Sequence, residues 1–161
     1  MKTRWQFLPT LMFFIVVIVS ATAWAEGIGI IEVTPLDFGY ITGAPGEYEA
    51  EKPAIVKFTA DFPVTVTIKA DPLEYAEKPK FGGLMNTEKD SLNVLYWVGG
   101  TEERSTQFAG NQWRTFSFEP SNKVHQLEIY GVVRISEIHG QPAGPYKGSI
   151  TVTISAAQGG G

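Results

Sequence analysis

The sequence contains no cysteine, and this absence excludes several kinds of protein. No disulfide can hold the chain together, and no thiol can serve as a nucleophile, redox centre or metal ligand. Histidine is scarce too, because only His125 and His139 occur and neither belongs to a metal-binding spacing. No G-x-S-x-G motif is present. The sequence therefore predicts a protein that is not an enzyme and has no catalytic, cofactor or metal site.

Carboxylates are more numerous, but no pattern assigns them a reaction. Glu74 and Glu77 share one stretch and Glu102 and Glu103 another, without any sign of the common cleft that glycoside hydrolysis needs. Calcium remains an open alternative, since extracellular domains bind it through loop oxygens, although no D-x-D-x-D-G loop exists. The carboxylates available for calcium are Asp61, Asp71, Glu74 and Asp90.

The N-terminus has the organisation of an export signal. Lys2 and Arg4 precede an apolar run over residues 11–19, and the segment ends in the small-residue pattern Ala23-Trp24-Ala25. This order predicts a signal peptide over residues 1–25, cleaved after Ala25. The run is shorter than the roughly 20 apolar residues that span a bilayer, although an uncleaved N-terminal anchor is the alternative. We therefore expect a secreted, periplasmic or cell-surface protein that meets the membrane only during export.

The mature chain would be acidic and of single-domain size. Without the two basic residues of the signal, 11 Lys and Arg face 17 Asp and Glu, a net charge of −6. An acidic exported domain is a poor ligand for nucleic acid or anionic lipid. We expect a β-sandwich domain over residues 26–155, followed by a flexible Gly-rich tail over residues 156–161.

Hydrophobic alternation with a period of two residues dominates the mature chain. Val56 and Phe58 alternate with Ile55, Lys57 and Thr59, and similar runs recur between Gly- and Pro-containing breaks. A helical period is absent, apart from one possible turn over residues 84–92. These features predict an all-β, immunoglobulin-like antiparallel sandwich of about seven to eight strands. The expected strands are 28–34, 36–42, 54–60, 64–69, 92–98, 113–119, 124–136 and 149–155.

Two stretches near the ends of the mature chain carry a resemblance. They are Leu36-Asp37-Phe38-Gly39, and residues 141–148, Gln-Pro-Ala-Gly-Pro-Tyr-Lys-Gly, which lead into a Thr/Val-rich strand. Together they resemble exported pilin-like and spore-coat-U-like subunits of the archaic chaperone–usher type. The chain departs from that pattern by its lack of a disulfide and by its glycine tail.

The resemblance implies a structural subunit of a pilus, coat or surface assembly that associates by β-strand addition. Its partners would be other copies or related exported subunits, with a periplasmic chaperone as a further partner. The candidate donor strand is Gly27-Ile28-Gly29-Ile30-Ile31, where Ile28 and Ile30 share a face. The alternative for this segment is that it forms the first strand of its own domain. Independently of the resemblance, Phe38 is expected to fill the core where the first strand bends.

Two other functions fit the same composition. A monomeric carbohydrate-binding module would use aromatic rings as flat platforms, and the candidates are Tyr96, Trp97 and Trp113 beside the stretch 99–112. Tyr130 and Tyr146 are further aromatic candidates, although core or sheet-face packing is the alternative for all of them. An accessory protein that folds or delivers other exported proteins is the third possibility.

Overall fold

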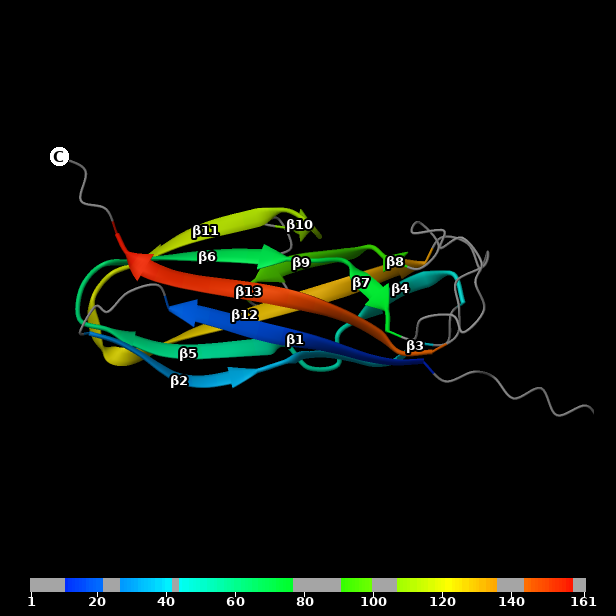
Figure 1. Cartoon of the computed structure of the whole chain (residues 1–161), viewed down its shortest axis with the longest axis horizontal. Coiled ribbons are helices and arrows are strands. Elements are labelled where there is room, and N and C mark those ends of the chain that lie inside the picture. Colours follow the sequence, from blue (N-terminus) through cyan, green and yellow to red (C-terminus); the bar gives the residue numbers. More distant parts are fainter. Residues whose placement is uncertain are drawn as a thin grey trace, which may run out of the picture.

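Two β-sheets stacked face to face make up the computed structural model of the chain (Figure 1). The structure describes residues 11–21, 27–41, 44–76, 91–99, 107–135 and 144–157, and within 11–21 it describes the backbone and the Val17 side chain. These residues form thirteen strands and no helix. The predicted all-β sandwich is therefore confirmed.

The first sheet contains the strand formed by the apolar N-terminal run. Its order is β11 (Trp113–Phe118), β6 (Val64–Ala70), β13 (Tyr146–Ala156), β1 (Leu11–Ala21) and β3 (Leu36–Ile41). Two short strands widen this sheet: β7 (Leu73–Tyr75) pairs with the first residues of β13, and β8 (Ser91–Leu92) pairs with β7. Every pairing in this sheet is antiparallel except that of β1 with β13, which is parallel.

The second sheet is antiparallel throughout. Its order is β10 (Phe108–Ala109), β9 (Val94–Val98), β12 (Ser121–Ile135), β5 (Ala54–Ala60) and β2 (Ile28–Thr34), and β4 (Gly46–Glu49) pairs with the far end of β12. The longest strand, β12, therefore holds this sheet together, because it pairs with β9, β5 and β4.

Alternation in the sequence explains the core. Every second residue of β5 and β6 is buried, while the Thr and Lys residues between them are half-buried or exposed. Residues 127, 129, 131, 133 and 135 of β12 are buried as well, as predicted. Val152 and Ile154 of β13 complete the facing layer. Each of these four strands thus has one face in the core between the sheets, which is where a sandwich buries its apolar surface.

Pro35 separates two strands that belong to different sheets. β2 pairs with β5 in the second sheet, whereas β3 pairs with β1 in the first. Proline has no N–H to donate to a ladder and restricts the residue before it, so the chain can leave one sheet here and enter the other. Immediately after this crossing, Phe38 is only 2% exposed. The prediction that Phe38 fills the core is confirmed.

Three strands lie where irregular chain was predicted, and a fourth lies in the predicted signal. β4, β7 and β10 have four residues or fewer, too short for alternation to show. The predicted strand 92–98 is interrupted at Asn93 and forms the end of β8 and the whole of β9. Of the possible helical turn at 84–92, only Ser91 and Leu92 are described, and they are strand. The cleavage site at 23–25 and residues 158–161 of the tail lie outside the described residues.

No helix in the described part of the chain has the length and hydropathy required to cross a lipid bilayer.

Candidate functional site

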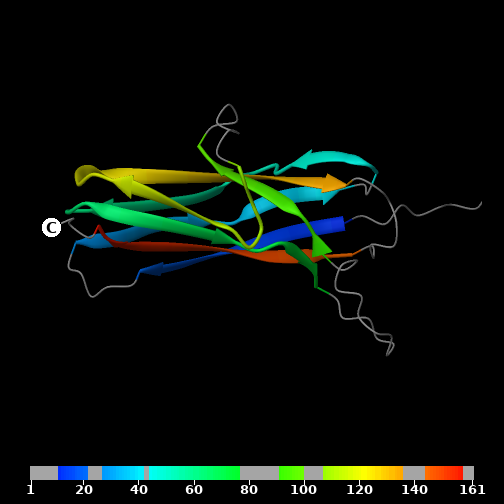
Figure 2. The ribbon, with the colours of Figure 1, turned by 90° about the horizontal axis from the view of Figure 1, so that it is seen from above.

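The most unusual feature of the fold is the place of β1. It lies between β13 and β3 in the first sheet, beside β13 in the same layer (Figure 2). Nine register pairs join it to β13 in parallel, from Phe13 with Tyr146 to Ala21 with Ile154. Five pairs join it to β3 in antiparallel, from Leu11 with Ile41 to Ile15 with Leu36. We call this place between β13 and β3 the β1 position.

Core residues border the β1 position on both sides. On β13, Tyr146, Ile150 and Val152 are fully buried, and they stand opposite residues 13, 17 and 19 of β1. On β3, Leu36 and Ile41 are buried opposite residues 15 and 11. Val17 is half-buried and packs against the core cluster. Alternate residues of any strand in this position therefore stand over the core.

The other face of β13 at the β1 position is polar. Lys147, Ser149, Thr151 and Thr153 stand opposite residues 14, 16, 18 and 20 of β1, and each is half-buried or exposed. A strand seated here would thus have one dry and one wet face, as in an antiparallel sandwich with one solvated side.

The order of strands shows what the β1 position corresponds to. β2, β5, β12 and β9 pair in the order of the A, B, E and D strands of an immunoglobulin sandwich. β6 and β13 pair in the same way as the C and F strands of the facing sheet. The strand that follows F in that fold is G, and its place beside F is filled here by β1, from the opposite end of the chain.

Part of the sandwich beside β1 is left uncovered. β3 pairs only with residues 11–15 of β1, so the far edge of residues 16–21 has no ladder partner among the described strands. Nearby, Ile30 and Val33 of β2 stand opposite the buried Phe58 and Val56, which places them on the core side of the second sheet. They are nevertheless 39% and 38% exposed. An apolar margin therefore remains open on this side of the molecule.

The candidate donor segment Gly27–Ile31 belongs to its own domain in this structure. Ile28 stands opposite Ala60 and Ile30 opposite Phe58 in the β2–β5 ladder. Gly27 accepts a backbone hydrogen bond from the N–H of Asp61 at 3.1 Å. Of the two alternatives for this segment, the structure supports the second: the segment belongs to β2, the first strand of its own domain.

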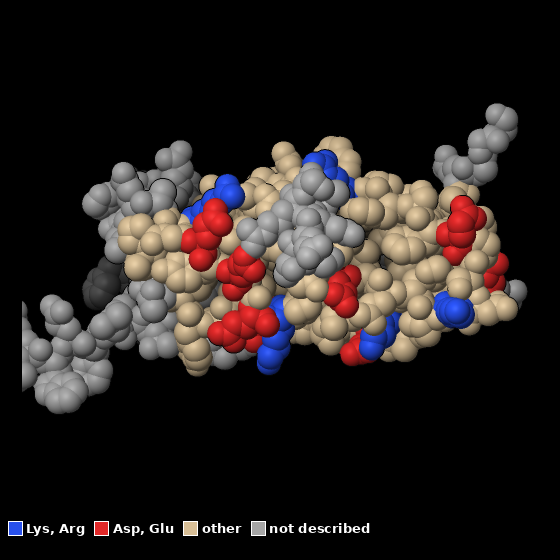
Figure 3. Space-filling view, turned by 180° about the vertical axis from the view of Figure 1, so that it is seen from behind, with Lys and Arg blue, Asp and Glu red and all other residues tan. Residues whose placement is uncertain are grey.

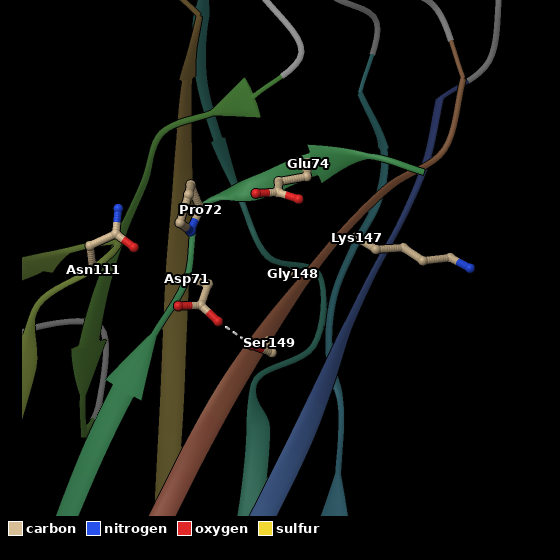
Figure 4. Close-up of a pocket in the computed structure, with 7 residues that line it drawn as sticks. All are labelled: Asp71, Pro72, Glu74, Asn111, Lys147, Gly148 and Ser149. Atoms are coloured by element: carbon tan, nitrogen blue, oxygen red, sulfur yellow. Dashed lines mark hydrogen bonds between the residues drawn. The ribbon is translucent and has the colours of Figure 1, made fainter. Parts of the chain in front are cut away.

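One depression on the described surface brings two of the calcium candidates together. It has a volume of about 380 Å³ and is lined by Asp71, Pro72, Glu74, Asn111, Lys147, Gly148 and Ser149 (Figure 4). The Ser149 hydroxyl donates to the Asp71 carboxylate, and the Lys147 side chain extends away from both carboxylates. Two carboxylates of this kind are short of the six to eight oxygens that calcium takes.

The other candidate residues that the structure describes do not line this depression. Asp61 lies in the β5–β6 turn, and Glu77, Asp90, Glu102, Glu103 and His139 lie outside the described residues. Within the described ranges, no three His, Asp or Glu side chains come close enough to hold a metal ion. His125 packs between Phe58 and Phe118, with ring centroids 5.1 and 5.4 Å away, which is the environment of a core residue.

Two of the three rings named for a carbohydrate platform lie in the core and not on the described surface. Tyr96 and Trp97 are 0% and 1% exposed, because β9 is covered on both faces. Burial and the neighbouring charge of Asp71 raise the pKa of Tyr96, whose hydroxyl donates to the Asp71 carbonyl at 2.8 Å. Tyr146 is also buried, and Tyr130 stacks on Trp97. Trp113 alone among the three platform candidates is exposed, at 66%.

Charges on the molecular surface are mixed. On the face turned away from the viewer in Figure 1, basic side chains are interspersed with acidic ones (Figure 3). Two cross-strand ion pairs, Lys57 with Glu32 at 2.6 Å and Arg134 with Glu47 at 2.7 Å, belong to the second sheet. Hydrogen bonds from Tyr130 and then Gln126 lower the pKa of Glu128. This distribution offers no patch of one sign for a charged ligand on that face.

No protein-family model and no curated protein matches the chain. Among the described residues, the β1 position is the feature that bears on function, because a strand from the N-terminal end of the chain fills it.

Proposed function

We propose that this chain is an exported, non-enzymatic structural subunit of a pilus, coat or surface assembly that associates by β-strand addition. One observation carries the proposal: the strand in the G position is made of residues 11–21, which are the apolar part of the predicted signal peptide. If residues 1–25 are removed on export, the folded domain loses the strand between β13 and β3.

Loss of β1 would leave two facing edges unpaired. β13 would lose nine register pairs and β3 five, while both keep partners elsewhere: β6 and β7 beside β13, and the bridge from Asp37 to Lys52 beside β3. Exposed edges with unpaired N–H and C=O groups are templates for a strand from another chain. The core residues bordering the position would also be uncovered, which adds a hydrophobic driving force.

The residues of β13 that border the β1 position determine what kind of strand can bind there. A suitable strand of about nine residues has apolar side chains at alternate positions, to cover Ile150, Val152 and Ile154. Between them it carries polar residues, which suit the Thr and Ser face of β13. The described strands of this chain are all engaged in its own sheets, so the strand would come from a related exported subunit or a periplasmic chaperone. The pilin-like resemblance of the end motifs agrees with such a partner.

Hydrogen exchange on the mature chain, residues 26–161, tests the proposal. Amides of β13 and β3 on the side of the β1 position should exchange faster than those of β12 and β5, which are paired on both sides. A synthetic peptide of residues 11–21, flanked by lysines for solubility, should slow their exchange and raise the melting temperature. The matched control is the same peptide with Val17→Asp, which places a carboxylate opposite Ile150.

The proposal fails if β13 is fully protected in a monomeric mature chain and the peptide has no effect. Equal effects of the two peptides would also contradict it, because the binding would then not depend on the core-facing register.

A further inference from the structure

We infer that residues 11–21 act as an intramolecular cap on the β1 position, so that the uncleaved chain cannot accept a partner strand. Removal of the leader then makes the chain competent for strand addition. This inference rests on the proposed function, because a cap has meaning only if the position accepts other strands.

The predicted cleavage site lies where a cut would release the cap and leave the sandwich intact. β1 ends at Ala21 and β2 begins at Ile28, and the bond between Ala25 and Glu26 lies between them. Hydrolysis of this one peptide bond by a leader peptidase uses water, and it yields a carboxylate on Ala25 and an amine on Glu26. No strand is cut, yet β1 ceases to be attached to the domain.

Covalent attachment to the domain favours binding of the cap over binding of a partner strand. The connection from Ala21 to Ile28 spans six residues, and a short flexible tether holds a segment at an effective concentration of about 1 mM. A partner strand at about 1 μM would therefore face a roughly thousandfold disadvantage of concentration in the uncleaved chain. After cleavage, the released leader and the partner strand would compete as separate molecules, each at its own concentration in solution.

The composition of β1 suits a cap rather than a specific partner. Residues 11–19 are apolar at every position, so in this register β1 also places apolar residues 14, 16 and 18 opposite the polar face of β13. A partner strand with alternating apolar and polar residues would match the two faces of β13 better. Once the tether is cut, such a strand can replace the leader.

The test compares binding of the lysine-flanked peptide 11–21, carrying a fluorescent label, to four forms of the protein. These are the mature chain 26–161, the full chain with cleavage blocked by Ala23→Leu and Ala25→Leu, and this blocked chain with Val17→Asp or with Ile18→Asp. Small residues before the cleavage site are what a leader peptidase requires, so the two leucines keep the leader attached.

The two aspartate variants form a matched pair. Val17 stands opposite the buried Ile150, whereas Ile18 stands opposite the half-buried Thr151. The blocked chain should bind the peptide at least about a hundredfold more weakly than the mature chain, within the limit set by the tether. Val17→Asp should restore binding to nearly the mature level, and Ile18→Asp should restore much less.

Equal binding by the blocked and mature chains would overturn the cap. Equal behaviour of the two aspartate variants would overturn it as well. If the mature chain does not bind the peptide, strand addition is the proposal that fails. Hydrogen exchange of β13 then decides on the cap separately: protection in the blocked chain that is lost with Val17→Asp supports it, and unchanged protection refutes it.

Discussion

Phe38 shows how one side chain joins the two sheets. It follows the crossing at Pro35, and its ring approaches Gly131 of β12 in the facing sheet. Phe38→Ala should lower the free energy of unfolding by about 3–5 kcal/mol, the usual cost of truncating a buried phenylalanine. Urea denaturation of the mature chain measures it. The control is Tyr40→Ala on the same strand, where the side chain is 61% exposed and a change within about 0.5 kcal/mol is expected.

A cost below about 1 kcal/mol for Phe38→Ala would contradict its place in the core.

His125 is a half-buried residue whose ring packs against aromatic side chains. Its Nε2 is buried without a hydrogen-bond partner among the described residues, between the rings of Phe58 and Phe118. His125→Phe removes this unsatisfied group and keeps a flat ring, so stability should be unchanged or higher by up to about 1 kcal/mol. His125→Asn keeps a polar group but loses the ring, and it should lower stability by about 1–3 kcal/mol.

Thermal unfolding of the two variants measures both effects. If His125→Phe destabilised the protein more than His125→Asn, the imidazole would have a polar role that this packing does not explain.

Among the elements, β12 and β3 pack closely against each other because β12 has a glycine, Gly131, at the point of contact. A Cβ on Gly131 would lie 2.9 Å from Phe38 Cζ and 3.0 Å from Leu36 Cδ2, both on β3. Gly131→Ala should therefore destabilise the fold by about 1–3 kcal/mol, the typical cost of overpacking a core. In a Phe38→Leu background the cost should fall, because the shorter side chain gives up the contested space.

A double-mutant cycle on the mature chain tests this coupling. Additive costs for Gly131→Ala and Phe38→Leu would show that the two residues do not contact each other in solution.

The strands predicted from the sequence are those with enough length to show alternation. β2 and β5 have the predicted bounds, and β6, β11 and β13 differ from prediction by a few residues at most. In β5, four buried residues alternate with three that are not, and this period of two is the whole signal. β4, β7 and β10 could not be predicted in this way, because edge pairing with β12, β13 and β9 creates them.

The sequence of β1 supports both of its descriptions. Five consecutive residues, 15–19, are β-branched, which favours a strand, and the same run is apolar enough for an export signal. The basic N-terminus and the A-x-A end favoured the signal, so a strand was not predicted. Both descriptions demand the same apolar side chains, and only the pairing with β13 and β3 reveals the strand.

At the scale of the whole molecule, the pairing of β1 with β13 joins residues that are far apart in the sequence. Residue 13 meets residue 146, and residue 21 meets residue 154, across nearly the full length of the domain. No turn or short motif in the sequence indicates such a parallel pairing, because parallel strands are joined by a long crossover and not by a hairpin. The candidate site could therefore not be located from the sequence, although the prediction of strand addition pointed to an incomplete sheet.

The lack of cysteine makes completion of the sheet more important for stability. A domain of this size without disulfides depends on its core and its strand pairing alone. The β1 position borders that core along β13 and β3. If residues 11–21 are removed as proposed, the chain would gain stability from a strand bound at the β1 position, which would link assembly to folding through mass action.

The proposed removal of residues 1–25 is required both for strand addition and for the cap, and it can be measured directly. Intact mass of the chain recovered from outside the cytoplasm should correspond to a start at Glu26, because the A-x-A pattern ends at Ala25. Ala23→Leu together with Ala25→Leu should yield the mass of the uncleaved chain. A wild-type exported protein that keeps residues 11–21 would contradict cleavage. β1 would then be a permanent strand of the first sheet in a self-contained sandwich, and neither strand addition nor a removable cap would follow.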